Sequence, residues 1–307
     1  MQNGLALERR LITDATRFAE NGWAWINQNL ALFVPDDPLD PADLQKCAEL
    51  ALLYSTTVSW SEDRRAELHR TKEFLLNFLA DPAMAQHARK RLIHYNPYFV
   101  PYLALRSLGY RSVAYEEGLF KAGRAGYPGA LELTPYRELE IAHLAWRAGL
   151  REERPLCTGV YEATVLARCQ NPIHLDLDAV YSITHTLFYL NDFCGPPEVM
   201  PAAEVRRAAQ LVESLLVHYW RKWDWDVVGE LLLNLVSLDR CDTTLFRLGI
   251  GALMEAWGSQ PDGALPGRSF EPSESEAEPG YRFKHCYHTT VVGILLCEAY
   301  RHRFGVS

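Results

Sequence analysis

Several features that would assign a protein to a familiar functional class are missing from this sequence. No stretch without charged residues approaches the length that a helix needs to span a bilayer. Residues 1–18 contain no apolar segment behind a basic one, so we expect no secretory signal. A glycine-rich nucleotide fingerprint is absent too, and we predict no cofactor. Together these absences predict a cytoplasmic protein with no membrane span.

Paired cysteines are missing as well. The seven cysteines are odd in number and widely scattered, and no two of them form a Cys-x-x-Cys pair. The sequence therefore predicts neither a disulfide framework nor a zinc ribbon. We expect buried free thiols, as is usual for a cytoplasmic protein.

Positive charge is scarce for a protein that binds nucleic acid. Lys and Arg number 31 against 39 Asp and Glu, which gives a net charge of −8 and a pI of about 5.7. Phosphate binding needs clustered basic side chains, so we expect no nucleic-acid partner. Hydrophobic residues make up 48% of the chain, which is enough for a substantial core.

Alternating strand patterns are nearly absent, and helical periodicity dominates instead. We therefore predict an all-α protein. The predicted helices cover residues 5–33, 43–57, 61–79, 82–94, 97–108, 113–122, 135–148, 157–169, 177–192, 202–222, 225–238, 243–257 and 287–304. Asp40 is a candidate cap for the second of them, and three others begin with a proline, which suits the first helical turn.

The predicted helices occur in pairs. Those with polar stripes or strongly apolar character are interpreted as inner helices and begin near residues 41, 97, 135, 178, 226 and 288. Helix pairs that recur every 40–50 residues or so are typical of repeat architectures. Six pairs account for the chain without obvious capping repeats, which favours a closed (α/α)6 toroid-like ring over the alternative, an open α-solenoid. We predict one domain over residues 1–307, with an acidic loop insertion at about 268–283.

One predicted inner helix carries polar groups along an otherwise apolar face. Asp178, His185 and Asp192 follow one another at intervals of seven residues, so a helix places them above each other. Buried ionisable groups need partners or a function. We therefore predict a polar, ligand-sized cavity beside Asp178 and His185. Asp192 lies at the far end of the helix and is predicted to be structural.

Two further helices repeat this pattern. Asp226, Glu230 and Asn234 are spaced four residues apart, and Glu140 precedes His143 by three. Carboxylates that face histidines in a desolvated pocket suit general acid–base catalysis, and the same groups could ligate a metal. Glu230 stands among apolar neighbours and is predicted to be buried, whereas Glu140 and His143 are predicted to form an exposed pair.

Structural explanations stay open for the same residues. Asp178 and Asp226 each suit a helix N-cap or a first-turn acid, which are the commonest uses of Asp at such positions. His185 suits a core histidine with satisfied hydrogen bonds.

Residues 253–267 run from a predicted helix into Gln260-Pro-Asp-Gly263, and the next predicted helix begins Tyr287-His288-Thr-Thr. This arrangement resembles α/α-toroid proteins, namely terpenoid cyclases of the squalene–hopene type and the β subunits of protein prenyltransferases. In those proteins such a loop leads from an outer helix to an inner one. The resemblance implies the toroid fold.

The same resemblance implies two kinds of functional residue. The prenyltransferase zinc site needs Asp-x-Cys before a histidine, and Asp239-Arg-Cys241 precedes His288 at about the right spacing. However, Asp239 is predicted at the C-terminal end of its helix, so we predict no metal there. The cyclase acid motif Asp-x-Asp-Asp is similar to Asp176-Leu-Asp178-Ala, which lacks the last acid.

The sequence thus favours an enzyme of specialised small-molecule metabolism, of the cyclase, isomerase or lyase type, acting on an apolar or cyclic substrate. In this hypothesis Asp178 is the acid or base and His185 orients or relays the proton. Asp226, Glu230 and His288 complete the polar wall. Two alternatives stay open: a glycan-active toroid hydrolase or lyase, with Trp223 and Trp225 as sugar platforms, and a non-catalytic helical-repeat scaffold.

Overall fold

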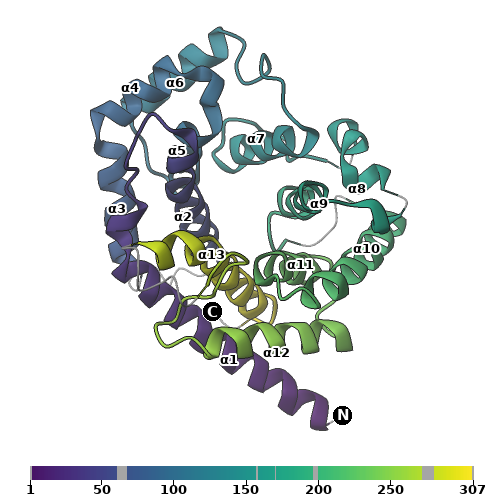
Figure 1. Ribbon diagram of the computed structural model, residues 1–307. Helices are drawn as coiled ribbons and strands as arrows, with labels where there is room; N and C mark the ends of the chain where they lie inside the picture. Colours follow the sequence, from purple (N-terminus) through teal and green to yellow (C-terminus); the bar gives the residue numbers. More distant parts are fainter. Residues whose placement is uncertain are drawn as a thin grey trace. The chain divides into compact units, whose positions relative to one another are not determined.

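The computed structural model describes residues 2–60, 68–156, 158–169, 171–195, 200–271 and 280–305, with the backbone alone for residues 2–7. These parts contain thirteen α-helices, several short 3-10 helices and no β-strand (Figure 1). The all-α prediction is therefore confirmed. No helix of the described parts is long and apolar enough to cross a membrane, and their six cysteines are all free thiols.

The chain divides into two units. The discontinuous unit consists of Met1–Gln28 together with Leu156–Ser307, and the inserted unit consists of Asn29–Pro155. That the whole chain forms one domain stays a prediction.

The inserted unit is built around α5, which packs against α2, α3, α4 and α7, while α4 also contacts α6. The predicted inner helices of this half, α2, α5 and α7, are thus neighbours in chain order. The Asp40 side chain accepts a hydrogen bond from the Ala42 amide at 2.9 Å, as expected of a cap for α2. The helices are α2 (Pro41–Trp60), α3 (His69–Ala80), α4 (Pro82–Lys90), α5 (Tyr95–Ser107), α6 (Val113–Arg124) and α7 (Pro135–Arg147).

The prediction that Glu140 and His143 are exposed is wrong. Their exposed fractions are 5% and 2%. Glu140 accepts hydrogen bonds of 2.8 Å from Asn96 on α5 and Arg137 on α7. The polar face of α7 is buried because it meets α5, a contact that a spacing of three residues along one helix does not reveal.

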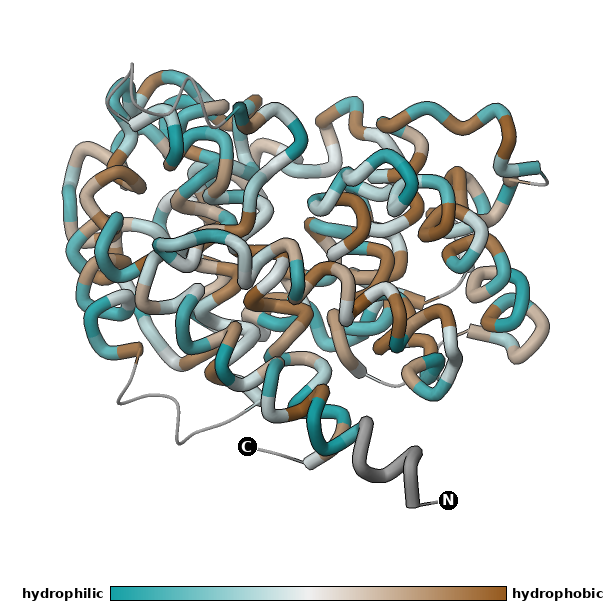
Figure 2. Tube along the Cα trace, turned by 60° about the horizontal axis from the view of Figure 1, so that its bottom comes forward, coloured by the Kyte–Doolittle hydropathy of each residue, from teal (hydrophilic) through white to brown (hydrophobic). Residues whose placement is uncertain are grey.

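The discontinuous unit is built around α11, of which every residue is buried. This helix packs against α9, α10, α12 and α13, and α13 packs in turn against α1. The helices are α1 (Gln2–Gln28), α8 (Val165–Arg168), α9 (Leu177–Leu190), α10 (Ala202–Trp220), α11 (Trp225–Ser237), α12 (Thr244–Gly258) and α13 (Tyr281–Arg303). Figure 2 shows that most helices alternate hydrophobic and hydrophilic residues, as amphipathic packing requires.

Several helix boundaries differ from the prediction. The expected helix 157–169 is instead the 3-10 helix Gly159–Ala163 followed by α8, which Thr164 caps through the Ala167 amide. Helix α1 ends at Gln28 rather than at residue 33. It continues through Gly22, where a Cβ would lie 2.6 Å from Ile294, so this glycine permits close packing against α13. Helix α13 begins six residues before the expected position 287. The acidic part of the loop, residues 272–279, lies outside the described residues.

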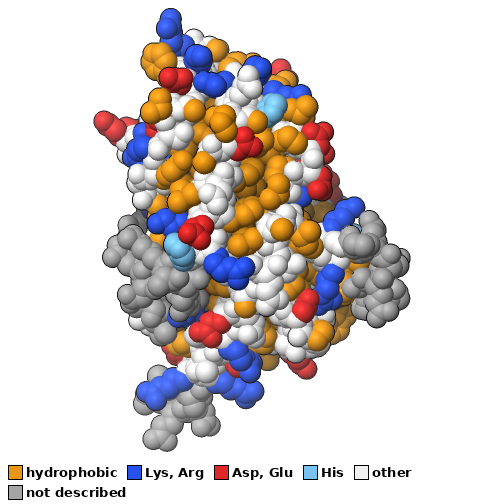
Figure 3. All heavy atoms as spheres, turned by 90° about the vertical axis from the view of Figure 1, so that its left-hand side faces the viewer, with side chains coloured by type: hydrophobic (Ala, Val, Ile, Leu, Met, Phe, Trp, Pro, Cys, Tyr) orange, Lys and Arg blue, Asp and Glu red, His pale blue; other side chains and the backbone are white. Residues whose placement is uncertain are grey.

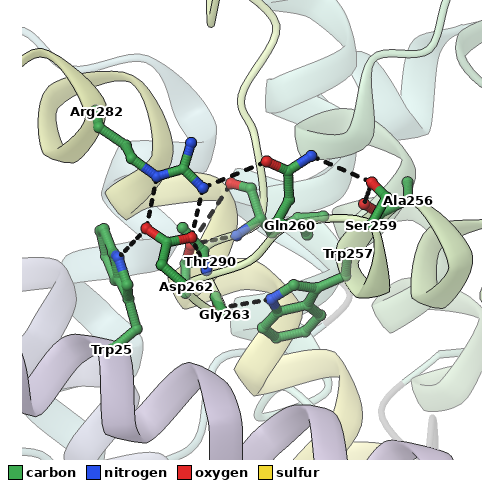
Figure 4. A network of polar contacts seen from close by, with 11 residues as sticks. Trp25, Ala256, Trp257, Ser259, Gln260, Asp262, Gly263, Arg282 and Thr290 are labelled. Atoms are coloured by element: carbon green, nitrogen blue, oxygen red, sulfur yellow. Dashed lines mark hydrogen bonds and ion pairs between the residues drawn. The ribbon is translucent and has the colours of Figure 1, made fainter. Parts of the chain in front are cut away.

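The segment that suggested the toroid resemblance has a clear structural role (Figure 4). The Asp262 carboxylate accepts hydrogen bonds from the Arg282 guanidinium, at 2.5 Å from Nε, and from the Trp25 indole at 3.2 Å. Three residues after Asp262, the Leu265 amide donates a hydrogen bond to the Thr290 hydroxyl at 2.9 Å. The loop after α12 is thereby tied to both α1 and α13.

The face of the molecule in Figure 3 carries basic and acidic side chains interspersed with hydrophobic ones. Several large hydrophobic side chains of the inserted unit are exposed, among them Val113 and Phe120 on α6 and Ile93 beyond α4. Single exposed residues of this kind are usual in folded proteins.

Candidate functional site

Three helices of the discontinuous unit contribute polar side chains to one cluster. Asp226 and Glu230 lie one turn apart on α11, and His288 comes from the adjacent α13. The carboxylates are deeply buried, with exposed fractions of 7% for Asp226 and 1% for Glu230. The prediction that Glu230 is buried is confirmed. Two carboxylates this deep in an apolar helix bundle require compensating partners.

Helix α9 supplies a hydroxyl group to each carboxylate. Tyr181 donates a hydrogen bond from its phenol to Asp226 Oδ2 at 2.6 Å, and Thr184 donates from its hydroxyl to Glu230 Oε2 at 2.5 Å. These donors are three residues apart on α9, and their acceptors are four apart on α11. The two helices therefore meet along matching faces.

His288 approaches the other oxygen of each carboxylate. Its Nε2 lies 3.4 Å from Asp226 Oδ1 and 3.9 Å from Glu230 Oε1. One potential ligand atom from each of the three residues lies within 4.8 Å of the other two. The His288 side chain is 35% exposed, so this corner of the cluster is open to solvent.

His185 lies on the other side of Glu230. Its Nδ1 is 2.9 Å from the Tyr181 carbonyl and 3.7 Å from Glu230 Oε2. A carbonyl oxygen only accepts hydrogen bonds, so Nδ1 carries the proton and donates it. In the neutral ring Nε2 is then the basic nitrogen, which is the tautomer that a general base or a metal ligand would use.

Burial and mutual repulsion shape the electrostatics of the cluster. Burial raises the pKa of the Tyr181 phenol, and the Asp226 carboxylate raises it further. Tyr181 therefore stays a hydrogen-bond donor throughout the physiological range. Burial, followed by the charge of Asp226, also raises the pKa of Asp224, whose Oδ2 lies 3.8 Å from Arg268 Nε.

Five residues were predicted from the sequence to be catalytic. The structure brings four of them together, namely His185, Asp226, Glu230 and His288. It does not bring in Asp178. That residue is exposed in the first turn of α9, and no side-chain hydrogen bond or ion pair of Asp178 is found in the described parts of the chain. The N-cap is Asp176, which accepts from the Ala179 amide at 2.8 Å. The polar stripe is thus exposed at Asp178 and half-buried at Tyr181 and His185, which corrects the expectation that Asp178 lies in the cavity.

His288 also differs from its expected position. It is the eighth residue of α13 rather than the second, because the helix already starts at Tyr281. The structure pairs it with Asp226 and Glu230, whereas Asp239 follows α11 and forms an ion pair with Arg303.

Two participants were missed by sequence reasoning. One is Thr184, which donates a hydrogen bond to Glu230. Asp224 is a third buried acid, with 3% exposure, and was not considered. The Asp224-Trp-Asp226 pattern at the start of an apolar helix is a signal that could have identified it. Of the proposed sugar platforms, Trp223 is 68% exposed and Trp225 is buried.

The chain was also compared with known proteins. Residues 19–298 match the profile of a family described as a domain of unknown function, DUF6895. No curated protein and no solved structure matches the chain.

Proposed function

The chain belongs to the DUF6895 family, and for it we propose an enzymatic function: proton transfer to or from a small-molecule substrate at the cluster of Asp226, Glu230 and His288. The observation that carries this proposal is the pair of carboxylates, 7% and 1% exposed, held beside the accessible imidazole of His288. Buried acids next to histidines are characteristic of acid–base sites because burial and neighbouring charges adjust their pKa values.

The exposures favour a division of roles. His288 and His185 are 35% and 21% exposed, so these rings can contact a substrate. Asp226 and Glu230 lie behind them, where they orient the imidazoles and stabilise the protonated ring. Tyr181 and Thr184 in turn hold the carboxylates in position. In this arrangement the histidines exchange protons with the substrate, and Asp178 has no assigned role.

A site of this composition suits isomerisation, elimination or cyclisation, in which a proton is removed at one atom and delivered at another. An apolar or cyclic substrate is part of the proposal, as are a cytoplasmic location and the absence of a nucleic-acid partner. The burial of both carboxylates is an argument against a pure scaffold, since the polar stripe of a scaffold would be solvated.

We also retain the closed ring of six helical hairpins as the proposed architecture, with the open solenoid as its alternative. The helix contacts that support this ring lie within each unit. The predicted inner helices α2, α5 and α7 contact one another in chain order, and so do α9, α11 and α13.

The experiment compares purified wild type with Glu230→Gln and His288→Ala by incubating each with a small-molecule extract of cells. Untargeted mass spectrometry then identifies compounds that wild type consumes. We expect each variant to lower the rate of consumption about 100-fold or more, because general acid–base residues contribute roughly 10²–10⁴-fold.

Matched controls come from the surface of the same unit. Glu255 on α12 and His218 on α10 are exposed, so Glu255→Gln and His218→Ala should consume the same compounds at the wild-type rate. Thermal melts establish that all four variants are folded. Consumption by Glu230→Gln and His288→Ala at the wild-type rate, or no consumption by wild type, would overturn the proposed function.

A further inference from the structure

We propose that Asp226, Glu230 and His288 bind one divalent first-row transition-metal ion. This proposal rests on the proposed function, because it concerns the same cluster. The metal ion would be the electrophile of that site. The three residues come from two adjacent helices, so the fold itself brings them together.

The distances fit such an ion. Ligands about 2.0–2.2 Å from a zinc ion, in tetrahedral or similar geometry, lie roughly 3–4 Å from one another. His288 Nε2 lies 3.4 Å from Asp226 Oδ1 and 3.9 Å from Glu230 Oε1. All three ligand atoms fall within 4.8 Å of one another. Small side-chain rotations are therefore enough to bring them into coordination.

A second observation comes from Asp226 alone. Its Oδ1 is buried and accepts no hydrogen bond from the described residues, although Oδ2 accepts one from Tyr181. A buried acceptor without a partner costs roughly 1–3 kcal/mol, and more when it is charged. This oxygen is the one nearest to His288 Nε2, so a cation bound between the two atoms would give it a partner.

The surroundings match those of protein metal sites. Ligating carboxylates are usually held by hydrogen bonds to their remaining oxygen, which fixes their orientation. Tyr181 donates such a hydrogen bond to Asp226, and Thr184 donates one to Glu230. Two carboxylate ligands together balance the charge of a divalent cation, so the ion and its ligands would form a neutral set inside the protein.

The ligand set indicates the class of metal. Imidazole favours zinc, iron and other transition metals, carboxylates are also suited to manganese, and no thiolate is present to favour Cu(I). Three protein ligands leave at least one coordination position for water, as in catalytic zinc sites. A bound water would become a stronger acid. Because Nε2 of His288 would then be a ligand, this water rather than His288 would exchange the proton with the substrate.

The test uses the full chain after chelator treatment and dialysis. Titration with Co²⁺, Zn²⁺ and Mn²⁺ in separate calorimetric experiments measures stoichiometry and affinity. We expect one equivalent per chain for at least one of these ions. Asp226→Asn, Glu230→Gln and His288→Ala should each weaken binding at least tenfold, while Glu255→Gln and His218→Ala should bind as wild type does.

The absorption spectrum of the Co²⁺-loaded wild type tests the proposal without any variant. Ligand-field bands without thiolate charge transfer are expected for one nitrogen and several oxygen ligands. A thiolate band, binding unaffected by the three ligand variants, or no stoichiometric uptake would overturn the inference. In the last case His288 contacts the carboxylates directly, without an ion between them.

The binding readout also separates this inference from the proposed function. Metal binding without consumption of any compound would leave the metal site standing and refute the enzyme. Consumption that persists at the full rate in metal-free protein, without stoichiometric uptake of any of the three ions, would support acid–base catalysis and refute the metal site.

Discussion

At the scale of single residues, the cluster depends on two hydroxyl groups that are easily overlooked. Thr184 is fully buried and its hydroxyl contacts Glu230 at 2.5 Å. Replacing it by valine keeps the volume but leaves one carboxylate oxygen without its donor. The hydroxyl is a positioning group, because it acts on the proposed ligand rather than on the ion.

We expect Thr184→Val to weaken Co²⁺ binding about 10- to 100-fold, the usual effect of losing a hydrogen bond to a metal ligand. Calorimetric titration measures it. Thr186→Val is the matched control, since Thr186 is also buried on α9 but donates only to the Ser182 carbonyl of its own helix. Equal affinities of the two variants would contradict the positioning role.

Another residue-scale prediction concerns pH. Hydrogen bonds from Arg207 and Tyr161 hold the pKa of Glu204 below its ordinary value of 4.5. A carboxyl group whose pKa is lowered on folding stabilises the folded state at pH values above its ordinary pKa. This stabilisation is lost as the pH falls through the lowered pKa. Because Glu204 is partly exposed, we expect about 0.5–1 kcal/mol.

Glu204→Gln should therefore lower the free energy of unfolding at pH 7. The difference from wild type should shrink toward zero as the pH falls below the lowered pKa of Glu204. Urea titrations at a series of pH values measure this. Glu255→Gln, on an exposed position of α12, should show no such pH-dependent difference. A constant deficit for Glu204→Gln would mean that packing, not charge, explains its effect.

At the scale of elements, glycines set how closely α13 packs. A Cβ on Gly293 would lie 2.7 Å from the ring of Trp257, which is 1% exposed and cannot move aside. Gly251 on α12 has no atom within 4 Å of such a Cβ. The two helical glycines therefore respond in opposite ways to the same substitution.

We expect Gly293→Ala to destabilise the protein by about 1–3 kcal/mol through overpacking. Gly251→Ala should stabilise it by about 0.5–1 kcal/mol, because alanine is the better helix former. Chemical denaturation of both variants gives the comparison. A stabilised Gly293→Ala would show that α13 shifts readily relative to Trp257.

The elements also show what the sequence could predict. The existence of most helices was predictable because each carries a local apolar stripe, as on α10 and α12. The ends of the helices were less predictable. Helix α13 starts at Tyr281, where Arg282 is bound to Asp262, and these two residues are twenty positions apart in the sequence.

The same limit applies to the site. Asp178 and Asp226 are both first-turn acids, and only the neighbouring helix shows that Asp226 has a phenol and an imidazole beside it.

At the scale of the whole molecule, the predicted single domain can be tested by calorimetry. If residues 1–307 unfold as one cooperative unit, the heat-capacity trace should show one transition, and Gly293→Ala should move all of it to lower temperature. Two transitions, of which Gly293→Ala moves only one, would show that the discontinuous and inserted units unfold separately.

The pairing of α1 with α13 has a consequence for synthesis on the ribosome. Helix α1 is translated before the inserted unit, whereas its partners α12 and α13 are translated after it. Its apolar face, including Gly22 against Ile294, stays uncovered during that interval. We therefore expect the apolar face of α1 to be prone to aggregation until α13 has been translated, and the cluster around His288 forms only at that late stage.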